Sequence, residues 1–185
     1  MNSDGFALAD TQIPTADHGP GMLRYFLMNR LLARCRSVAE ALAEIAALPH
    51  AGGGSLVLGD ATGAAAWIEL RHSRVDVAQG AWVVHTNHYI AAPDALAPVP
   101  HSVGRLEVLR AALSADAACD PRALLATHAP EAVCRHAPDV SPTLAGAVWD
   151  CRDRSALVAD GPPCATAWIR FVPDGSGWRE THASS

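Results

Sequence analysis

Residues 55–89 read SLVLGDATGAAAWIELRHSRVDVAQGAWVVHTNHY. In this stretch, short apolar runs alternate with turn-forming tetrapeptides, Asp60-Ala61-Thr62-Gly63 and Arg71-His72-Ser73-Arg74. Apolar runs of strand length between such turns are typical of antiparallel hairpins. The strands predicted here are 55–58, 64–70, 75–78 and 82–85, the last of which stops at Thr86-Asn87-His88.

Helices and further strands are predicted on both sides of this meander. Apolar residues recur at helical spacing over 22–36. Ser37 with Glu40 three residues later forms a capping-box pattern for a second helix. The other predicted elements are strands at 6–13, 143–150, 155–159 and 164–172, and helices at 37–48, 102–113 and after Asp120-Pro121. The sequence therefore predicts a single α+β unit followed by a polar tail.

The composition excludes several classes of protein. The 185 residues carry a net charge of −5, so neither nucleic acid nor an anionic membrane surface is an expected partner. No apolar run approaches the roughly 18 residues that span a bilayer. Residues 1–10 contain acids and no base, unlike a signal peptide. We therefore expect a cytoplasmic protein.

The cysteines argue against a disulfide framework and a zinc ribbon. There are five, an odd number, and no two of them form a Cys-x-x-Cys pair. They are Cys35, Cys119, Cys134, Cys151 and Cys164. We expect reduced thiols that are mostly buried, and no metal site.

Several local patterns occur in the order found in one known family. They are Met1-Asn2-Ser3-Asp4-Gly5-Phe6, Ser37-Val38-Ala39-Glu40-Ala41, Asp60-Ala61-Thr62-Gly63, Trp67-Ile68-Glu69, Val83-Val84-His85-Thr86-Asn87-His88-Tyr89, Ser102-Val103-Gly104-Arg105, Val133-Cys134-Arg135-His136, Thr143-Leu144-Ala145-Gly146-Ala147-Val148 and Gly161-Pro162-Pro163-Cys164. Over residues 1–172 the chain resembles the penicillin acyltransferase (peptidase C45) family of cysteine N-terminal-nucleophile hydrolases. The segment around Asn87 is the most specific part of this resemblance.

The resemblance implies a fold and a chemistry. The fold is a four-layer αββα sandwich, and the nucleophile is a cysteine whose own α-amine acts as the base. No cofactor is implied, and the substrate is a small amide or acyl thioester. Asn87 matches the family's oxyanion-hole asparagine, and Arg105 matches an arginine that binds a substrate carboxylate or holds the site's geometry.

The family's nucleophile lies upstream of the segment that matches Met1–Phe6. We therefore expect residues 1–172 to be the C-terminal part of the domain, an incomplete sandwich lacking its N-terminal strands, with 173–185 as a polar tail. Such a truncated chain is expected to be inactive alone. The alternative is a non-catalytic scaffold, or the subunit of a split enzyme that binds an N-terminal partner or an acyl ligand.

Other interpretations of these residues stay open. Asn87 also suits a turn, and Arg105 also suits a surface pair with Glu107 or Asp94. His85 and His88 suit structural roles better than zinc ligation, and Glu69 suits a solvent-facing carboxylate better than a site neighbour. Two further patterns are weak. These are a Cys134–His136 dyad, and a phosphate loop at Gly52-Gly53-Gly54, which lacks the following Gly-Lys-Ser/Thr.

Overall fold

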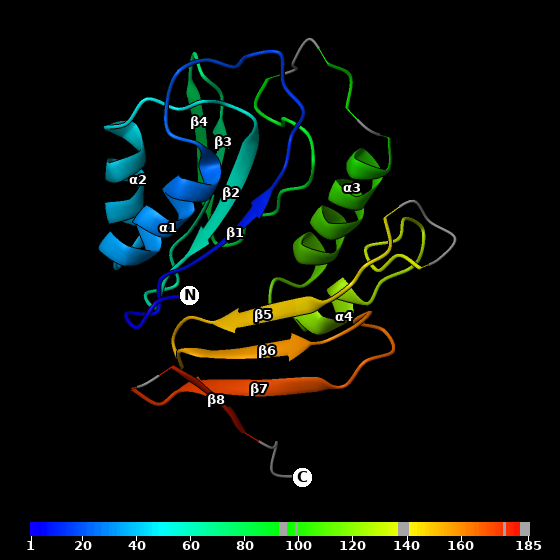
Figure 1. Ribbon diagram of the computed structural model, residues 1–185. Coiled ribbons are helices and arrows are strands. Elements are labelled where there is room, and N and C mark those ends of the chain that lie inside the picture. The colour runs from blue at the N-terminus through cyan, green and yellow to red at the C-terminus, as the bar shows by residue number, and fades with distance from the viewer. Residues whose placement is uncertain (93–95, 99, 137–140, 176, 182–185) are drawn as a thin grey trace.

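The computed structural model describes the chain except residues 93–95, 99, 137–140, 176 and 182–185. It shows an α+β fold with two antiparallel four-stranded sheets, ordered β1-β2-β3-β4 and β5-β6-β7-β8 (Figure 1). The first sheet contains β1 (Ala7–Thr11), β2 (Gly54–Gly59), β3 (Ala65–Leu70) and β4 (Val75–Gly80). The second contains β5 (Gly146–Asp150), β6 (Ser155–Ala159), β7 (Trp168–Pro173) and β8 (Trp178–Thr181). The helices are α1 (Arg24–Arg34), α2 (Val38–Ala46), α3 (Pro100–Ala115) and α4 (Pro121–Leu125).

The predicted meander is confirmed for its first three strands and wrong for its fourth. Residues 82–85 form no strand, because the chain leaves the sheet after Gly80 instead of pairing with β4. The His85 side chain holds this segment against the sheet, because it contacts Ser55 and Glu69. Asn87 therefore lies in a loop and not at the end of a strand.

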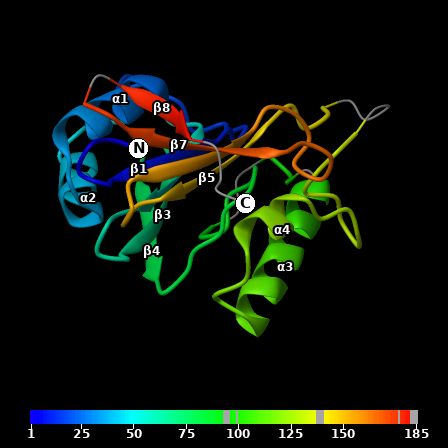
Figure 2. The same ribbon diagram turned by 90° about the horizontal axis from the view of Figure 1, so that it is seen from below.

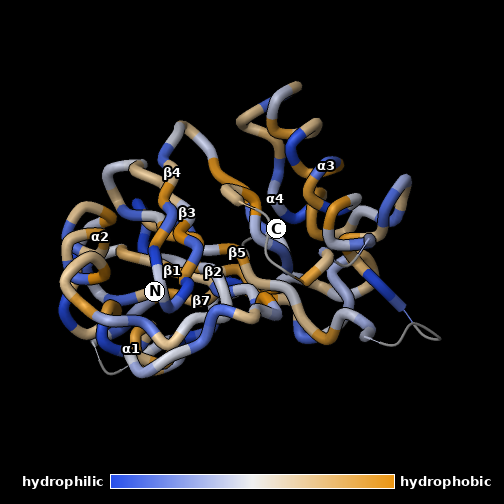
Figure 3. The backbone as a smooth tube through the Cα atoms, turned by 90° about the horizontal axis from the view of Figure 1, so that it is seen from above, coloured by the Kyte–Doolittle hydropathy of each residue, from blue (hydrophilic) through white to orange (hydrophobic). Residues whose placement is uncertain are grey.

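Helices α1 and α2 cover one face of the first sheet and close the main core. On α1 the buried side chains are Arg24, Leu27 and Leu31, whereas Leu23 and Phe26 are exposed although they belong to the same apolar pattern. Figure 3 shows hydrophobic and hydrophilic residues alternating along both helices. The buried core members are Phe6, Leu8, Leu27, Leu31, Cys35, Val38, Ala41, Ile45, Leu56, Leu58, Ala66, Ile68 and Leu70.

Two polar side chains tie this helical layer to the sheet. Asp60 Oδ2 accepts a hydrogen bond from the backbone N–H of Val38 at 2.8 Å, so the turn after β2 holds the first residue of α2. Asn2 Nδ2 donates to the carbonyls of Leu32 and Cys35 at 3.0 and 2.7 Å, which satisfies backbone acceptors at the end of α1. These contacts give a structural reason for two of the motifs noted in the sequence.

The predicted capping box is present in a modified form. The Ser37 hydroxyl accepts from the backbone N–H of Glu40 at 3.2 Å, as the pattern predicts. The Glu40 carboxylate accepts from the N–H of Arg36 at 2.8 Å, one residue before the N-cap.

The second sheet has a much smaller buried core. On its strands only Ser155, Ala156 and Ala159 are buried, while the rings of Trp149 and Trp178 are partly exposed and lie 6.1 Å apart. Its last strand, β8, forms within the predicted polar tail and pairs with β7. Helices α3 and α4 lie together, away from α1 and α2 (Figures 1 and 2).

The two sheets contact each other at the β5–β6 turn. A side chain at Gly5, whose φ is +82°, would collide with the carbonyl oxygen of Cys151, so the close approach requires glycine there. Arg154 Nη1 adds a hydrogen bond to the carbonyl of Ser3 at 3.2 Å. The predicted α+β class is confirmed, whereas the four-layer sandwich stays a prediction. Within the described ranges, no helix has both the length and the apolar character needed to cross a bilayer.

Candidate functional site

The segment from His85 to Ala91 lies across the face of the first sheet opposite α1 and α2. A buried polar network holds it there. His85 Nε2 lies 3.0 Å from Glu69 Oε1 on β3, and His85 Nδ1 lies 2.8 Å from Ser55 Oγ on β2. The backbone N–H groups of Ile90 and Ala91 also donate to the Glu69 carboxylate. Glu69 is fully buried, so the interpretation as a solvent-facing carboxylate is wrong.

The contacts of this network indicate that Glu69 is ionised. The carbonyl oxygen of Thr86 lies 2.7 Å from His85 Nδ1. Burial raises the pKa of Glu69, but the hydrogen bonds from His85, Ile90 and Ala91 lower it more, and the result is a lowered pKa. Glu69 is therefore a carboxylate, and His85 Nε2 faces it at 3.0 Å.

The next residues attach the segment to α3. Thr86 Oγ1 donates to the carbonyl of Ser102 at 2.9 Å, and His88 Nδ1 lies 2.9 Å from Ser102 Oγ. Burial, followed by the nearby positive charge of His85, lowers the pKa of His88. The structure thus gives both histidines hydrogen-bonding roles, and their Nδ1 and Nε2 atoms are not among the grouped ligand atoms found in the described residues.

Between these anchors, Asn87 contacts Arg105. Arg105 Nη2 donates to Asn87 Oδ1 at 2.7 Å, and Asn87 Nδ2 donates to the carbonyl of Gln12, just after β1, at 3.1 Å. Two residues that are 18 positions apart and were selected separately in the sequence are therefore in direct contact. Burial and the charge of Arg135 lower the pKa of Arg105, while Glu131 raises it.

This pair fixes which way the amide faces. A guanidinium has only donors, so the Asn87 oxygen must face Arg105 and its NH₂ group must face away. One N–H of that group binds Gln12. An amide NH₂ has two donors, so the second N–H is available to donate a hydrogen bond to a ligand oxygen.

The sequence offered two alternative surface partners for Arg105, Asp94 and Glu107. Asp94 lies outside the described residues. Arg105 is half-buried on α3 and donates to Asn87 and, at 3.3 Å, to the carbonyl of His101. The structure therefore gives it a more specific role than a surface pair with Glu107.

The five cysteines are unpaired, and within the described part of the chain none of them is hydrogen-bonded to Asn87. Cys35 belongs to the main core, Cys151 lies at the contact between the sheets, and Cys134 and Cys164 lie together beyond α4. Cys134 Sγ is 3.8 Å from His136 Nε2, but the same nitrogen also contacts His128 and Cys164. A simple Cys134–His136 dyad is therefore not what the structure shows. The sequence analysis missed His128 and Cys164 as partners, because no spacing rule joins them to residues 134–136.

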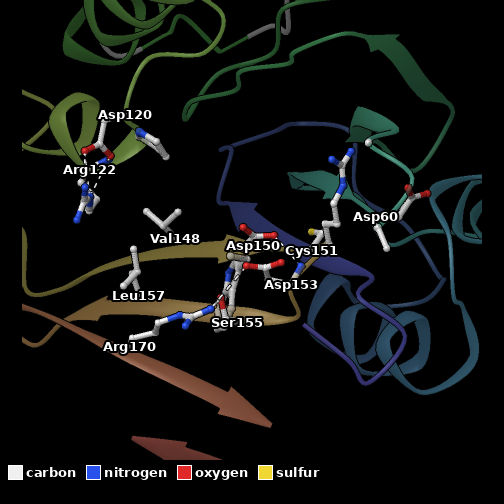
Figure 4. A pocket seen from close by; sticks show the side chains of 15 residues that line it. Asp60, Asp120, Arg122, Val148, Asp150, Cys151, Asp153, Ser155, Leu157 and Arg170 are labelled. Atoms are coloured by element: carbon white, nitrogen blue, oxygen red, sulfur yellow. Dashed lines mark hydrogen bonds and ion pairs between the residues drawn. The ribbon is translucent and has the colours of Figure 1, made fainter. Parts of the chain in front are cut away.

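A cavity of about 700 Å³ lies between the second sheet, the start of α4 and the β2–β3 turn (Figure 4). Its charged side chains largely neutralise one another, since Arg122 pairs with Asp120 at 2.8 Å and Arg170 lies 3.6 Å from Asp153. Asn87 and Arg105 are not among its lining residues. This cavity and the predicted site are therefore different places.

Two comparisons with known proteins bear on the chain. A search of curated proteins returned no match. A family model described as acyl-coenzyme A:6-aminopenicillanic acid acyl-transferase matches residues 1–163, which include Asn2, Asp60, Glu69, Asn87 and Arg105. The match covers most of the chain and confirms the predicted resemblance. The chain belongs to the acyl-coenzyme A:6-aminopenicillanic acid acyl-transferase family.

Proposed function

We propose that this chain forms the oxyanion-binding part of a cysteine-type acyltransferase or amidohydrolase. Asn87 donates its free amide N–H to the oxyanion that develops on the substrate carbonyl, and Arg105 positions that amide. Residues 1–172 are then the C-terminal part of an N-terminal-nucleophile αββα sandwich. The substrate is a small amide or an acyl thioester, in keeping with the acyl transfer named in the family's description.

The observation that carries the proposal is the 2.7 Å hydrogen bond from Arg105 to Asn87 Oδ1. A donor stabilises a transition state best when it is already oriented, since no reorganisation is then needed as charge develops. Here the guanidinium orients the amide and also polarises it, which makes its N–H a stronger donor. The buried anchors at His85 and Thr86 hold the residues before Asn87 against β3 and α3.

In this proposal the nucleophilic cysteine belongs to residues outside this sequence. Cys35 and Cys134 are buried, and the other three cysteines lie on different elements from Asn87. An N-terminal cysteine attacks the carbonyl carbon while its α-amine takes the thiol proton, and the leaving group departs when the tetrahedral intermediate collapses. Water or an amine then resolves the acyl-enzyme. We also propose a cytoplasmic location, which five unpaired thiols support.

The test joins the chain to the cysteine-bearing upstream segment of a family member and measures hydrolysis or acyl transfer. Asn87→Ala is expected to lower kcat by about a hundredfold or more, the usual cost of removing one oxyanion donor. The matched control is Asn29→Ala, the same chemical change on the exposed side of α1. Equal kcat for Asn87→Ala and the control would contradict the assignment, provided both variants unfold at the same denaturant concentration.

Arg105→Ala separates the two roles predicted for that residue. Loss of a positioning contact lowers kcat, whereas loss of a grip on a substrate carboxylate raises KM. The hydrogen bond to Asn87 leads us to expect the effect on kcat. The non-catalytic alternative would be supported if the joined protein, with its cysteine intact, bound acyl ligands but formed no acyl-enzyme by mass spectrometry.

A further inference from the structure

Four potential metal ligands lie close together beyond α4, outside the Asn87–Arg105 contact. They are His128, Cys134, His136 and Cys164, each of which offers one ligand atom, and these atoms all lie within 4.8 Å of one another. Three of the residues come from the connection between α4 and β5, and the fourth comes from the turn between β6 and β7. Figures 1 and 2 show both segments at the same end of the second sheet.

Four of the separations, 3.1–3.8 Å, are close to those around a tetrahedral ion. His128 Nε2 and His136 Nε2 are 3.1 Å apart, and His136 Nε2 and Cys164 Sγ are 3.2 Å apart. Cys134 Sγ lies 3.5 Å from Cys164 Sγ and 3.8 Å from His136 Nε2. Zinc bonds of about 2.3 Å to sulfur and about 2.0–2.1 Å to nitrogen place tetrahedral ligands roughly 3.3–3.8 Å apart.

Ordinary hydrogen bonding explains this arrangement less well. One imidazole nitrogen, His136 Nε2, has three neighbours, although a neutral ring nitrogen serves as either one donor or one acceptor. The two sulfurs are too far apart for a disulfide, whose S–S bond is about 2.05 Å. Four ligand atoms gathered within 4.8 Å of one another are the arrangement that a shared cation requires.

We propose that His128, Cys134, His136 and Cys164 form a zinc site. Two thiolates and two imidazoles are the donor set of closed structural zinc sites, and the set contains no carboxylate to favour magnesium or calcium. Binding releases the two thiol protons to solvent, so the site is filled more tightly as pH rises. All four positions of the tetrahedron are taken by protein, so the ion is structural.

The site would stabilise the part of the molecule that has the least core. It links the α4–β5 connection to the β6–β7 turn, and thereby braces a sheet whose buried strand residues are Ser155, Ala156 and Ala159. Backbone hydrogen bonds already fold the α4–β5 connection back on itself. The N–H groups of Val133 and Cys134 both donate to the carbonyl of Thr127, at 2.9 and 3.0 Å. This places Cys134 near His128, on the side facing Cys164.

The experiment measures zinc in the reduced, tag-free chain after dialysis against zinc and then against buffer. About one zinc ion per chain is expected, and cobalt in its place should give the intense visible bands of a tetrahedral site and a thiolate charge-transfer band. Cys164→Ser is expected to lower zinc retention at least tenfold, because it removes a ligand from an exposed turn. Cys119→Ser leaves the same number of thiols and is the matched control.

Each possible result either supports the zinc site or overturns it. Retention of zinc by the wild type and by Cys119→Ser, with loss in Cys164→Ser and His128→Ala, supports the site. Failure of the reduced wild type to retain zinc or cobalt overturns it. Equal retention by Cys164→Ser and Cys119→Ser also overturns it, as does a Cys134–Cys164 disulfide found by mass spectrometry in the freshly purified chain without metal. Circular dichroism of the variants identifies any that fail to fold, and His128→Ala, at an exposed residue, then repeats the comparison.

Discussion

The two sheets have the same number of strands and the same simple strand order, yet they are stabilised differently. The first is covered by α1 and α2 over a continuous apolar core, and its other face has the buried Glu69–His85 pair. The second buries only small side chains on its strands and leaves Trp149 and Trp178 partly exposed. Strand pairing alone therefore does not set the stability of a sheet in this molecule. What differs is the layer packed against each sheet.

The largest expected difference comes from the same substitution in both sheets. Leu56→Ala on β2 removes a fully buried side chain and should lower the free energy of unfolding by about 2–5 kcal/mol. Leu157→Ala on β6 removes a half-buried one and should cost well under half as much. Urea denaturation of both variants measures this difference. Equal costs would show that the second sheet has a tighter core than its exposure indicates.

Acid should affect the first sheet before the second. Glu69 and Asp60 have pKa values lowered below 4.5 and 3.8, their ordinary values, because the hydrogen bonds they accept outweigh burial, which raises both values. A lowered pKa in the folded state means that the stabilisation is complete above the ordinary value and is lost as pH falls through the lower, folded value. Stability should therefore be constant above about pH 5 and fall below pH 4.5.

Hydrogen exchange at decreasing pH, analysed for β2–β3 and β6–β7 separately, measures this acid effect. Glu69→Gln, which cannot ionise, should flatten the acid dependence of the first sheet. An unchanged acid dependence in that variant would assign the effect to Asp60 or to other carboxylates.

The smallest expected effect is on a charged pair of the second sheet. Arg170 Nη2 lies 3.6 Å from Asp153 Oδ2, and both side chains are substantially exposed. Exposed pairs of this kind contribute about 0–1 kcal/mol, so Asp153→Asn should change stability by less than about 1 kcal/mol. Thermal unfolding at low and high salt is a sufficient measurement. A larger loss would mean that Asp153 has a further role in the nearby cavity.

The features that could be predicted from the sequence depend on neighbouring residues. The hairpins, the Ser37 cap and the Asp120-Pro121 helix start each depend on a few consecutive positions, and the structure confirms them. The burial of Glu69 could not be predicted in this way, because it depends on His85 and Ile90 from a different part of the chain. The same is true of residues 82–85, which are held by side chains across the sheet and not by strand pairing.

The candidate site also has features that the sequence predicted and features that only the tertiary fold reveals. Asn87 and Arg105 were identified through the family resemblance, but their direct contact required the loop and α3 to be placed together. The roles of these two residues in catalysis stay predictions. His128 and Cys164 are separated by 36 positions, and only the tertiary fold brings them near Cys134 and His136.

The hydrogen bonds of the Asp60 carboxylate restrict which residues can replace it at this position. Its Oδ1 accepts from the backbone N–H and hydroxyl of Thr62, at 2.9 and 2.6 Å, and its Oδ2 accepts from the N–H of Val38. Asparagine has the same shape but only one oxygen, so its NH₂ group would face a donor whichever way the amide turned. Glutamate carries both oxygens but moves them one methylene further from the turn. The position thus distinguishes aspartate from its two nearest chemical relatives, one by hydrogen-bond polarity and the other by length.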